Sequence, residues 1–140
     1  MRDRIESLED VGVLLRRHGI NPTRQRLEIA RALFSNPGHL SADQVLSAVN
    51  KSRPPTSKAT VYNTLNLFRD RGLIREVNAN PDKVFYDPNT SPHYHFYDVD
   101  TGELTDIDAR AVELTGLPPL PPGTVTEGID IIVRVRSKAP

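Results

Sequence analysis

Two histidines separated by one residue, His93 and His95, are the side chains of this sequence best suited to bind a metal. On a β-strand, side chains at i and i+2 point to the same face, about 7 Å apart along the chain, so two imidazoles can share one ion. Six carboxylates lie nearby in the sequence: Asp87, Asp98, Asp100, Glu103, Asp106 and Asp108. Mixed nitrogen and oxygen ligands suit Zn, Fe(II) or Mn(II). The alternative is a solvated pair on an edge strand that binds nothing.

The segment that begins at Ser57 and stops at Gly72 predicts a helix with one face suited to DNA. Ser57 is placed to cap its first turn, Pro54 and Pro55 end whatever precedes it, and Gly72 supplies the stop. At ~100° per residue, the helix has one apolar face that would be buried, formed by Val61, Leu65 and Phe68. Its opposite face is mainly polar and consists of Lys58, Ala59, Tyr62, Asn63 and Asn66. Asn amides bind adenine edges, and Tyr or Ala can contact a thymine methyl group. An ordinary amphipathic helix with a solvated polar face is the alternative.

Three more helices are predicted ahead of this one. Apolar spacing predicts the first over residues 8–18, and a second begins near Thr23. Ser41 and Gln44 form a capping box that starts the third. We add four residues at helix starts to the expected DNA contacts: Arg24, Arg26, Ser57 and Thr60.

Two strands are predicted after the Ser57 helix, over residues 73–77 and 84–87, with a turn-rich link over 78–82. Helices followed by a hairpin are typical of a winged helix-turn-helix. In that arrangement the last helix enters the major groove of double-stranded DNA and the hairpin contacts the backbone.

The remaining sequence predicts a second, smaller domain. Strands are expected over 93–99, 103–107 and 129–135, with a short helix over 109–115 and a stiff proline-rich connector over 118–122. Such an antiparallel sheet with exposed edges is a natural homodimerisation unit, and two-fold symmetry would present two reading helices to two half-sites. The fold class is therefore α+β, with a winged-helix DNA-binding domain over 1–90 and a dimerisation and effector-sensing domain over 91–140.

Charge divides the chain in the same way. Residues 1–76 hold 13 Lys and Arg against 8 Asp and Glu, a net of +5, whereas residues 77–140 hold 5 against 10, a net of −5. A basic domain that contains the proposed reading helix is expected of a DNA-binding protein, because phosphate neutralisation supplies much of the affinity.

Composition excludes several classes of protein. The chain has no cysteine, so it has no disulfide, no catalytic thiol and no Cys-ligated structural zinc. No apolar run approaches the ~18 residues of a membrane span, and no signal-peptide core is present, so we expect a cytoplasmic protein without membrane contact. Two alternatives remain open: a small metal-dependent enzyme built on the two histidines, and a winged-helix protein-interaction module. We expect no enzyme, because no further catalytic constellation accompanies the histidines.

Five short motifs resemble, in order and spacing, the ferric uptake regulator (Fur) family over roughly residues 8–136. They are residues 21–26, 39–42, 59–62, 84–86 and 93–95, which read NPTRQR, HLSA, ATVY, VFY and HYH. The resemblance implies a dimeric winged-helix transcription regulator whose DNA binding responds to a metal or a related signal. It also implies that Tyr62 contacts a base, whereas Asn63 and Asn21 replace basic residues that are common in the family.

The same resemblance implies a regulatory metal site between the domains. Its ligands correspond to His39, His93, His95 and Asp106, with Asp106 where the family usually has Glu. Another carboxylate ligand falls on Tyr86, and the neighbouring Asp87 is the candidate to replace it. The paired CxxC zinc motifs of the family are absent.

Several departures from the common Fur pattern are similar to the iron response regulators (Irr) of alphaproteobacteria. They include Asn63, the missing cysteines and the ending IDIIVRVR over residues 129–136. That subgroup implies haem as the effector, with His93 and His95 as axial ligands and His39 as a further candidate. The sequence leaves open whether the effector promotes or releases DNA binding.

Overall fold

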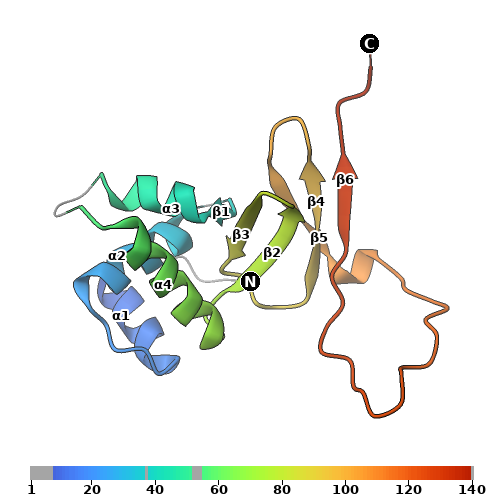
Figure 1. Ribbon diagram of the computed structural model, residues 1–140, viewed down its shortest axis with the longest axis horizontal. Helices are drawn as coiled ribbons and strands as arrows, with labels where there is room; N and C mark the ends of the chain where they lie inside the picture. Colours follow the sequence, from blue (N-terminus) through green and yellow to red (C-terminus); the bar gives the residue numbers. More distant parts are fainter. Residues whose placement is uncertain (1–7, 37, 52–54, 140) are drawn as a thin grey trace. The chain divides into compact units, whose positions relative to one another are not determined.

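The computed structural model describes residues 8–36, 38–51 and 55–139. The chain forms two compact units, Met1–Thr90 and Ser91–Pro140, and each is described here by itself. Figure 1 labels their helices and strands. Pro54, predicted to end the segment before the Ser57 helix, lies outside the described residues, as do the first seven residues of the predicted 1–90 domain. No helix in the described ranges is both long and apolar enough to cross a membrane.

The first unit contains the predicted series of helices. They are α1 (Leu8–Arg17), α2 (Arg24–Ser35), α3 (Ala42–Val49) and α4 (Lys58–Asp70). Side-chain caps start three of them: the oxygens of Thr23, Ser41 and Ser57 accept hydrogen bonds from the backbone N–H three residues on. The capping box predicted at Ser41 and Gln44 is confirmed in both directions.

Glycine in the left-handed region ends α4. Gly72 has φ +74°, and the backbone N–H of Leu73 donates to Phe68 O at 2.9 Å, which closes the last turn. The stop predicted at Gly72 is therefore confirmed, and it turns the chain directly into the hairpin.

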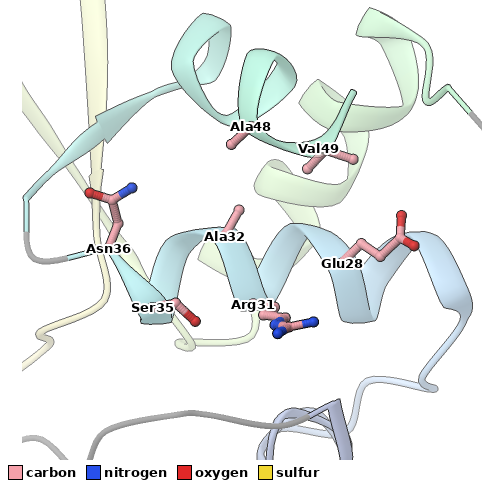
Figure 2. Close-up of a pocket in the computed structure, with 7 residues that line it drawn as sticks. All are labelled: Glu28, Arg31, Ala32, Ser35, Asn36, Ala48 and Val49. Carbon is pink, nitrogen blue, oxygen red and sulfur yellow. The ribbon is translucent and has the colours of Figure 1, made fainter. Parts of the chain in front are cut away.

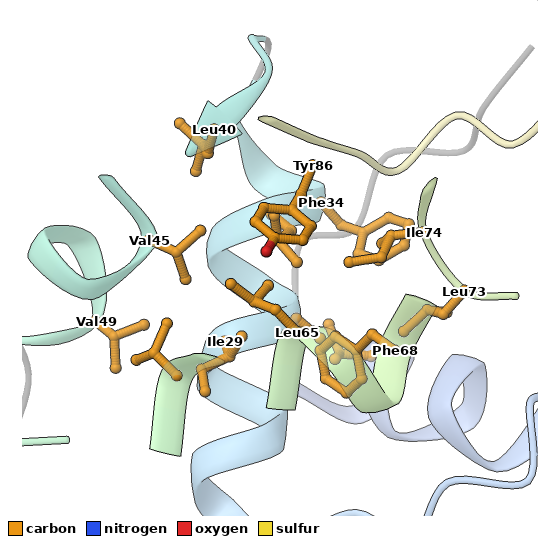
Figure 3. Close-up of a cluster of buried hydrophobic side chains, with 14 of the residues drawn as sticks. Ile29, Phe34, Leu40, Val45, Val49, Leu65, Phe68, Leu73, Ile74 and Tyr86 are labelled. Carbon is orange, nitrogen blue, oxygen red and sulfur yellow. The ribbon is translucent and has the colours of Figure 1, made fainter. Parts of the chain in front are cut away.

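The core of the first unit lies where α4 packs against the other helices. Val61, Leu65 and Phe68, the predicted inner face of α4, are all completely buried. Figure 3 shows Leu65 and Phe68 among buried side chains that include Ile29 and Tyr86. Burial of one face fixes the orientation of α4 about its axis, so its polar face must point outward.

The first unit also contains a three-stranded antiparallel sheet with the strand order β1-β3-β2. The hairpin strands β2 (Arg75–Asn80) and β3 (Lys83–Asp87) confirm the predicted wing. The predicted turn-rich link over 78–82 was too long, because β2 continues to Asn80 through a register shift and only Pro81 and Asp82 turn. The strand β1 (Leu40–Ser41), which pairs with β3, was not predicted from the sequence.

The second unit is a three-stranded sheet in the order β5-β4-β6. Strands β4 (His93–Asp98) and β5 (Leu104–Asp108) pair antiparallel, as predicted. The third strand, β6 (Ile132–Val135), pairs parallel to β4, so the sheet is mixed and the wholly antiparallel sheet was wrong. A parallel pair needs a long crossover, which residues 109–131 supply.

Two boundaries in this unit also differ from prediction. The helix expected over 109–115 is only a single 3₁₀ turn, Ala109–Ala111, because so short a segment ahead of Gly116 cannot offset the cost of helix nucleation. The last strand begins at Ile132 instead of Ile129, since its register with β4 would place Ile129 opposite Pro92, ahead of the first residue of β4.

Candidate metal centre and nucleic-acid interface

Three potential metal ligands of the second unit converge on one point. His93 and His95 both lie on β4, and their Nε2 atoms are each 3.6 Å from Oδ1 of Asp106. The registry of β4 with β5 explains this, since His95 pairs directly with Asp106. Both histidines are buried, whereas the Asp106 side chain is 48% exposed. Ligand atoms around one small ion lie roughly 3–3.5 Å apart, so this spacing suits a shared ion.

The tautomer of His93 is set by the backbone. Its Nδ1 lies 2.7 Å from the carbonyl oxygen of Ser91, which accepts a hydrogen bond only from a protonated nitrogen. In the neutral ring Nε2 then keeps its lone pair and faces Asp106. Metal-bound histidines commonly donate their second N–H to a backbone carbonyl in this way.

A second His–carboxylate pair lies in the first unit. His39 Nε2 and Asp87 Oδ2 are 3.1 Å apart, and both side chains are nearly buried. Strand β1 accounts for the pair: Leu40 lies opposite Tyr86, so the residues before and after them, His39 and Asp87, come face to face. The family resemblance had made His39 a ligand candidate, but its pairing with Asp87 has no local signal in the sequence, because a two-residue strand has no periodicity to recognise.

Tyr86, at the position of a family carboxylate ligand, belongs instead to the core of the first unit. Burial raises the pKa of its phenol, and the nearby carboxylate of Glu76 raises it further. A neutral phenol is a poor metal ligand, so Asp87 is the better ligand candidate from this strand.

Three other acidic residues near the histidines, Asp98, Asp100 and Asp108, have structural partners. Asp98 accepts hydrogen bonds from the backbone N–H groups of Asp100 and Thr101 and so closes the β4–β5 turn. Asp100 accepts from the N–H of Ser137. Asp108 binds the Arg110 side chain and its backbone N–H, which lowers the carboxyl pKa to about 2.

The polar face of α4 is presented as predicted. Lys58, Ala59, Tyr62 and Asn63 are exposed and Asn66 is half-buried. Ser57 and Thr60 bond each other through their side-chain oxygens at 2.9 Å, so their hydroxyls serve the helix cap first. The Lys58 ammonium lies 5.7 Å from the centroid of the Tyr62 ring and 3.9 Å from Oδ1 of Asp43, a neighbour that sequence analysis missed.

The two arginines predicted to contact DNA lie in the first turn of α2. Arg24 is exposed and its Nε donates to Glu28 Oε1 at 3.3 Å, whereas Arg26 Nη1 donates to the carbonyl oxygen of Asn21 at 2.9 Å. The backbone contact holds Arg26 close to the turn that precedes α2. Arg24 is the more available of the two for a phosphate.

Two surface hollows in the described part of the first unit can be compared with the predicted site. One, of about 390 Å³, lies between α2 and α3, where Ala32 points toward Ala48 and Val49 (Figure 2). It contains none of the predicted site residues. The other, of about 240 Å³, is lined by Tyr62 of α4, the start of α3 and the hairpin turn. This second hollow borders the predicted reading face.

Comparison with known proteins agrees with this fold. Residues 17–116 match the ferric uptake regulator family. Over 100 residues, which are 71% of this chain and 67% of the relative, the sequence is 35% identical to the peroxide-responsive repressor PerR of Staphylococcus epidermidis. The chain belongs to the ferric uptake regulator family, a family of metal-responsive transcription regulators.

Solved structures are similar along nearly the whole chain. The ferric uptake regulator of Pseudomonas aeruginosa with manganese has a TM-score of 0.68 at 26% identity, covering 91% of this chain and 98% of that one. The ferric uptake regulator of Francisella tularensis with iron has a TM-score of 0.66 at 23% identity, covering 86% and 93%, a likeness of fold alone. The iron response subgroup stays a prediction, since the relative compared here is a peroxide-responsive repressor.

Proposed function

We propose that this protein is a DNA-binding transcription regulator whose affinity for its operator is controlled by a divalent metal ion. The observation that carries the proposal is the convergence of His93 and His95 on Asp106, in a chain whose α4 presents an exposed Tyr, Asn and Lys. The manganese- and iron-containing structures of family members make Mn(II) and Fe(II) the first ions to test.

We propose further that one ion takes ligands from both units. The second unit offers two imidazoles and one carboxylate, and the first offers one of each. Divalent transition metals in proteins bind roughly four to six ligands, so neither group is complete without further ligands. His39, Asp87, His93, His95 and Asp106 together satisfy this requirement with nitrogen and oxygen donors alone.

The ion would act by linking the two units. An ion that needs ligands from both restricts the positions that α4 can take relative to the second unit. DNA affinity then changes by the ratio of the ion's affinities for the permitted and excluded arrangements. Each protein ligand must lose or lack a proton to bind the ion, which makes the response depend on pH.

A homodimer fits this function. On the sheet of the second unit Phe96 pairs with Val133, and both side chains are about 40% exposed. Val135, two residues further along β6, is also exposed. We propose that a second copy covers this apolar face, which would present two α4 helices to two half-sites of an operator.

The test is fluorescence anisotropy with promoter DNA from an iron-uptake gene of the source organism. Protein stripped with chelator is titrated with Mn(II), Fe(II) under anaerobic conditions, or haemin. We expect a divalent ion to change DNA affinity in the native protein but not in a His93→Ala/His95→Ala variant. His18→Ala, in the turn directly after α1, is the matched control; the Nδ1 atom of His18 contacts Leu14 O. Equal metal responses in all three proteins would refute the proposed site.

Haem is the second candidate effector, as the iron response resemblance implies. His93, His95 or His39 would supply the axial ligand. The ring centroids of His93 and His95 are only 4.6 Å apart, and both Nε2 atoms face Asp106. The two imidazoles therefore cannot bind one haem iron as axial ligands from opposite sides. Haemin that releases bound DNA, with a Soret band lost in the His93→Ala/His95→Ala variant, would establish this candidate.

A further inference from the structure

A carboxylate from another helix lies within the polar face of α4. Asp43 is the second residue of α3, and its Oδ1 is 3.9 Å from Nζ of Lys58, the first residue of α4. The same ammonium lies 5.7 Å from the Tyr62 ring centroid. These three side chains, the Asp43 cluster, therefore share the surface on which base contacts are proposed.

The position of Asp43 is fixed by its neighbours. The capping box holds both sides of the turn: Ser41 N–H donates to Gln44 Oε1 at 2.8 Å, and Gln44 N–H donates to Ser41 Oγ at 3.3 Å. An aspartate in a first turn also stabilises its own helix through the helix dipole. That role alone does not require a cation opposite it.

The contact between Asp43 and Lys58 stabilises α4 more than it stabilises α3. A cation in the first turn of a helix opposes the helix dipole, and α4 has no acidic residue in its own first turn. Asp43 supplies the missing negative charge. The side chains of Lys58 and Asp43 are 65% and 72% exposed, so water screens the pair and a competing anion can exchange with it.

In the proposed DNA complex, a backbone phosphate is the anion that competes with Asp43 for Lys58. Asp43 and Tyr62 line the hollow of about 240 Å³ together with Asp82 of the hairpin turn and Lys83, the first residue of β3. In a winged helix bound to DNA, the phosphate backbone passes beside the reading helix and the wing. A phosphate arriving here meets repulsion from Asp43 and attraction from Lys58, and Asp43 competes with it for the same ammonium.

We propose that Asp43 determines specificity by restraining Lys58 from phosphate contacts that any DNA sequence could offer. Such contacts raise affinity for all duplexes equally and carry no sequence information. With Lys58 held over Tyr62, binding depends more on the base contacts of the α4 face. This inference rests on the proposed DNA-binding function and adds a specificity-determining residue to it.

The experiment measures the affinity of Asp43→Asn for operator and scrambled duplexes of equal length over a salt series. Asp43→Asn should bind the scrambled duplex about two- to fivefold more tightly than the native protein does. Its gain in affinity for the operator should be smaller. The plot of log K against log salt should steepen by about 0.9 for each Lys58 that gains a phosphate. Asp43→Glu, which keeps the charge, should retain native discrimination.

Two comparisons isolate the contact from the change in net charge. Asp70→Asn removes the same charge at the far end of α4, where Asp70 bonds Arg69, and should leave the ratio of operator to scrambled affinity unchanged. In a Lys58→Met background, Asp43→Asn should have no effect beyond that of Asp70→Asn. All variants are checked by thermal unfolding.

The outcomes separate the two proposals. A native protein that binds operator, together with equal effects of Asp43→Asn and Asp70→Asn, overturns the role of Asp43 alone. A Lys58→Met background that leaves the effect of Asp43→Asn intact does the same. Failure of the native protein to bind any promoter DNA, with or without effector, overturns the proposed function and this inference with it.

Discussion

His95 and Asp106 lie directly opposite each other on β4 and β5, with Nε2 and Oδ1 3.6 Å apart. This separation is longer than a hydrogen bond and close to that between two ligands of one ion. A cross-strand pair also has little freedom to rearrange, because both backbones are held by the ladder. The backbone position of Asp106, the proposed ligand, is thus set before a metal binds.

Replacing Asp106 by Asn should weaken Mn(II) binding by one to two orders of magnitude, because the amide lacks the negative charge that favours a hard cation. The expected loss is about 10- to 100-fold in metal affinity, measured by isothermal titration calorimetry. Asp108→Asn is the matched control, since Asp108 lies two residues further along β5 and binds Arg110. Equal losses in the two variants would mean that general charge, and not ligation, is responsible.

Replacing Asn63 by Ala should reduce operator affinity and relax base preference at one position in each half-site. A side-chain amide that makes two hydrogen bonds to adenine contributes about 1–3 kcal/mol of discrimination. Binding to a panel of operators with single base changes measures both effects. Asn36, the C-cap residue of α2, provides the control substitution, because it lies on neither α4 nor the hairpin. A uniform loss of affinity over the whole panel would instead indicate a backbone contact.

Local signals made most of the first unit predictable. Helix starts were predictable at Thr23, Ser41 and Ser57, because a capping hydroxyl bonds the backbone N–H only three residues on. The buried face of α4 was predictable from the spacing of its apolar residues. The strand pair around His93 and Asp106 was predictable for the same reason, since a turn and alternating side chains lie within one short segment.

Long-range pairing was not predictable from the sequence. Strand β1 exists only because Leu40 meets Tyr86, far along the chain, and that pairing brings His39 to Asp87. The parallel alignment of β6 with β4 likewise depends on a crossover of irregular chain. The contact between Asp43 and Lys58 joins two separate helices, so no local pattern could indicate it.

Replacing Phe68 by Ala should destabilise the first unit by about 3–5 kcal/mol, because the side chain is fully buried and its removal leaves a cavity. Urea unfolding followed by circular dichroism measures the change. Phe96→Ala, on the exposed face of β4, is the control and should have a much smaller effect on the stability of the monomer. Similar losses in the two variants would contradict the burial described for α4.

Replacing Tyr86 by Phe should flatten the decline in stability at high pH. Burial raises the pKa of the Tyr86 phenol above its ordinary value near 10, so the fold favours the neutral form. Its contribution is complete below the pKa of the unfolded chain and is lost as pH rises through the higher folded value. Free energies of unfolding measured by urea between roughly pH 8 and pH 11 should therefore fall more steeply for the native protein than for Tyr86→Phe. Parallel profiles for the two proteins would show that the phenol is not held neutral by the core.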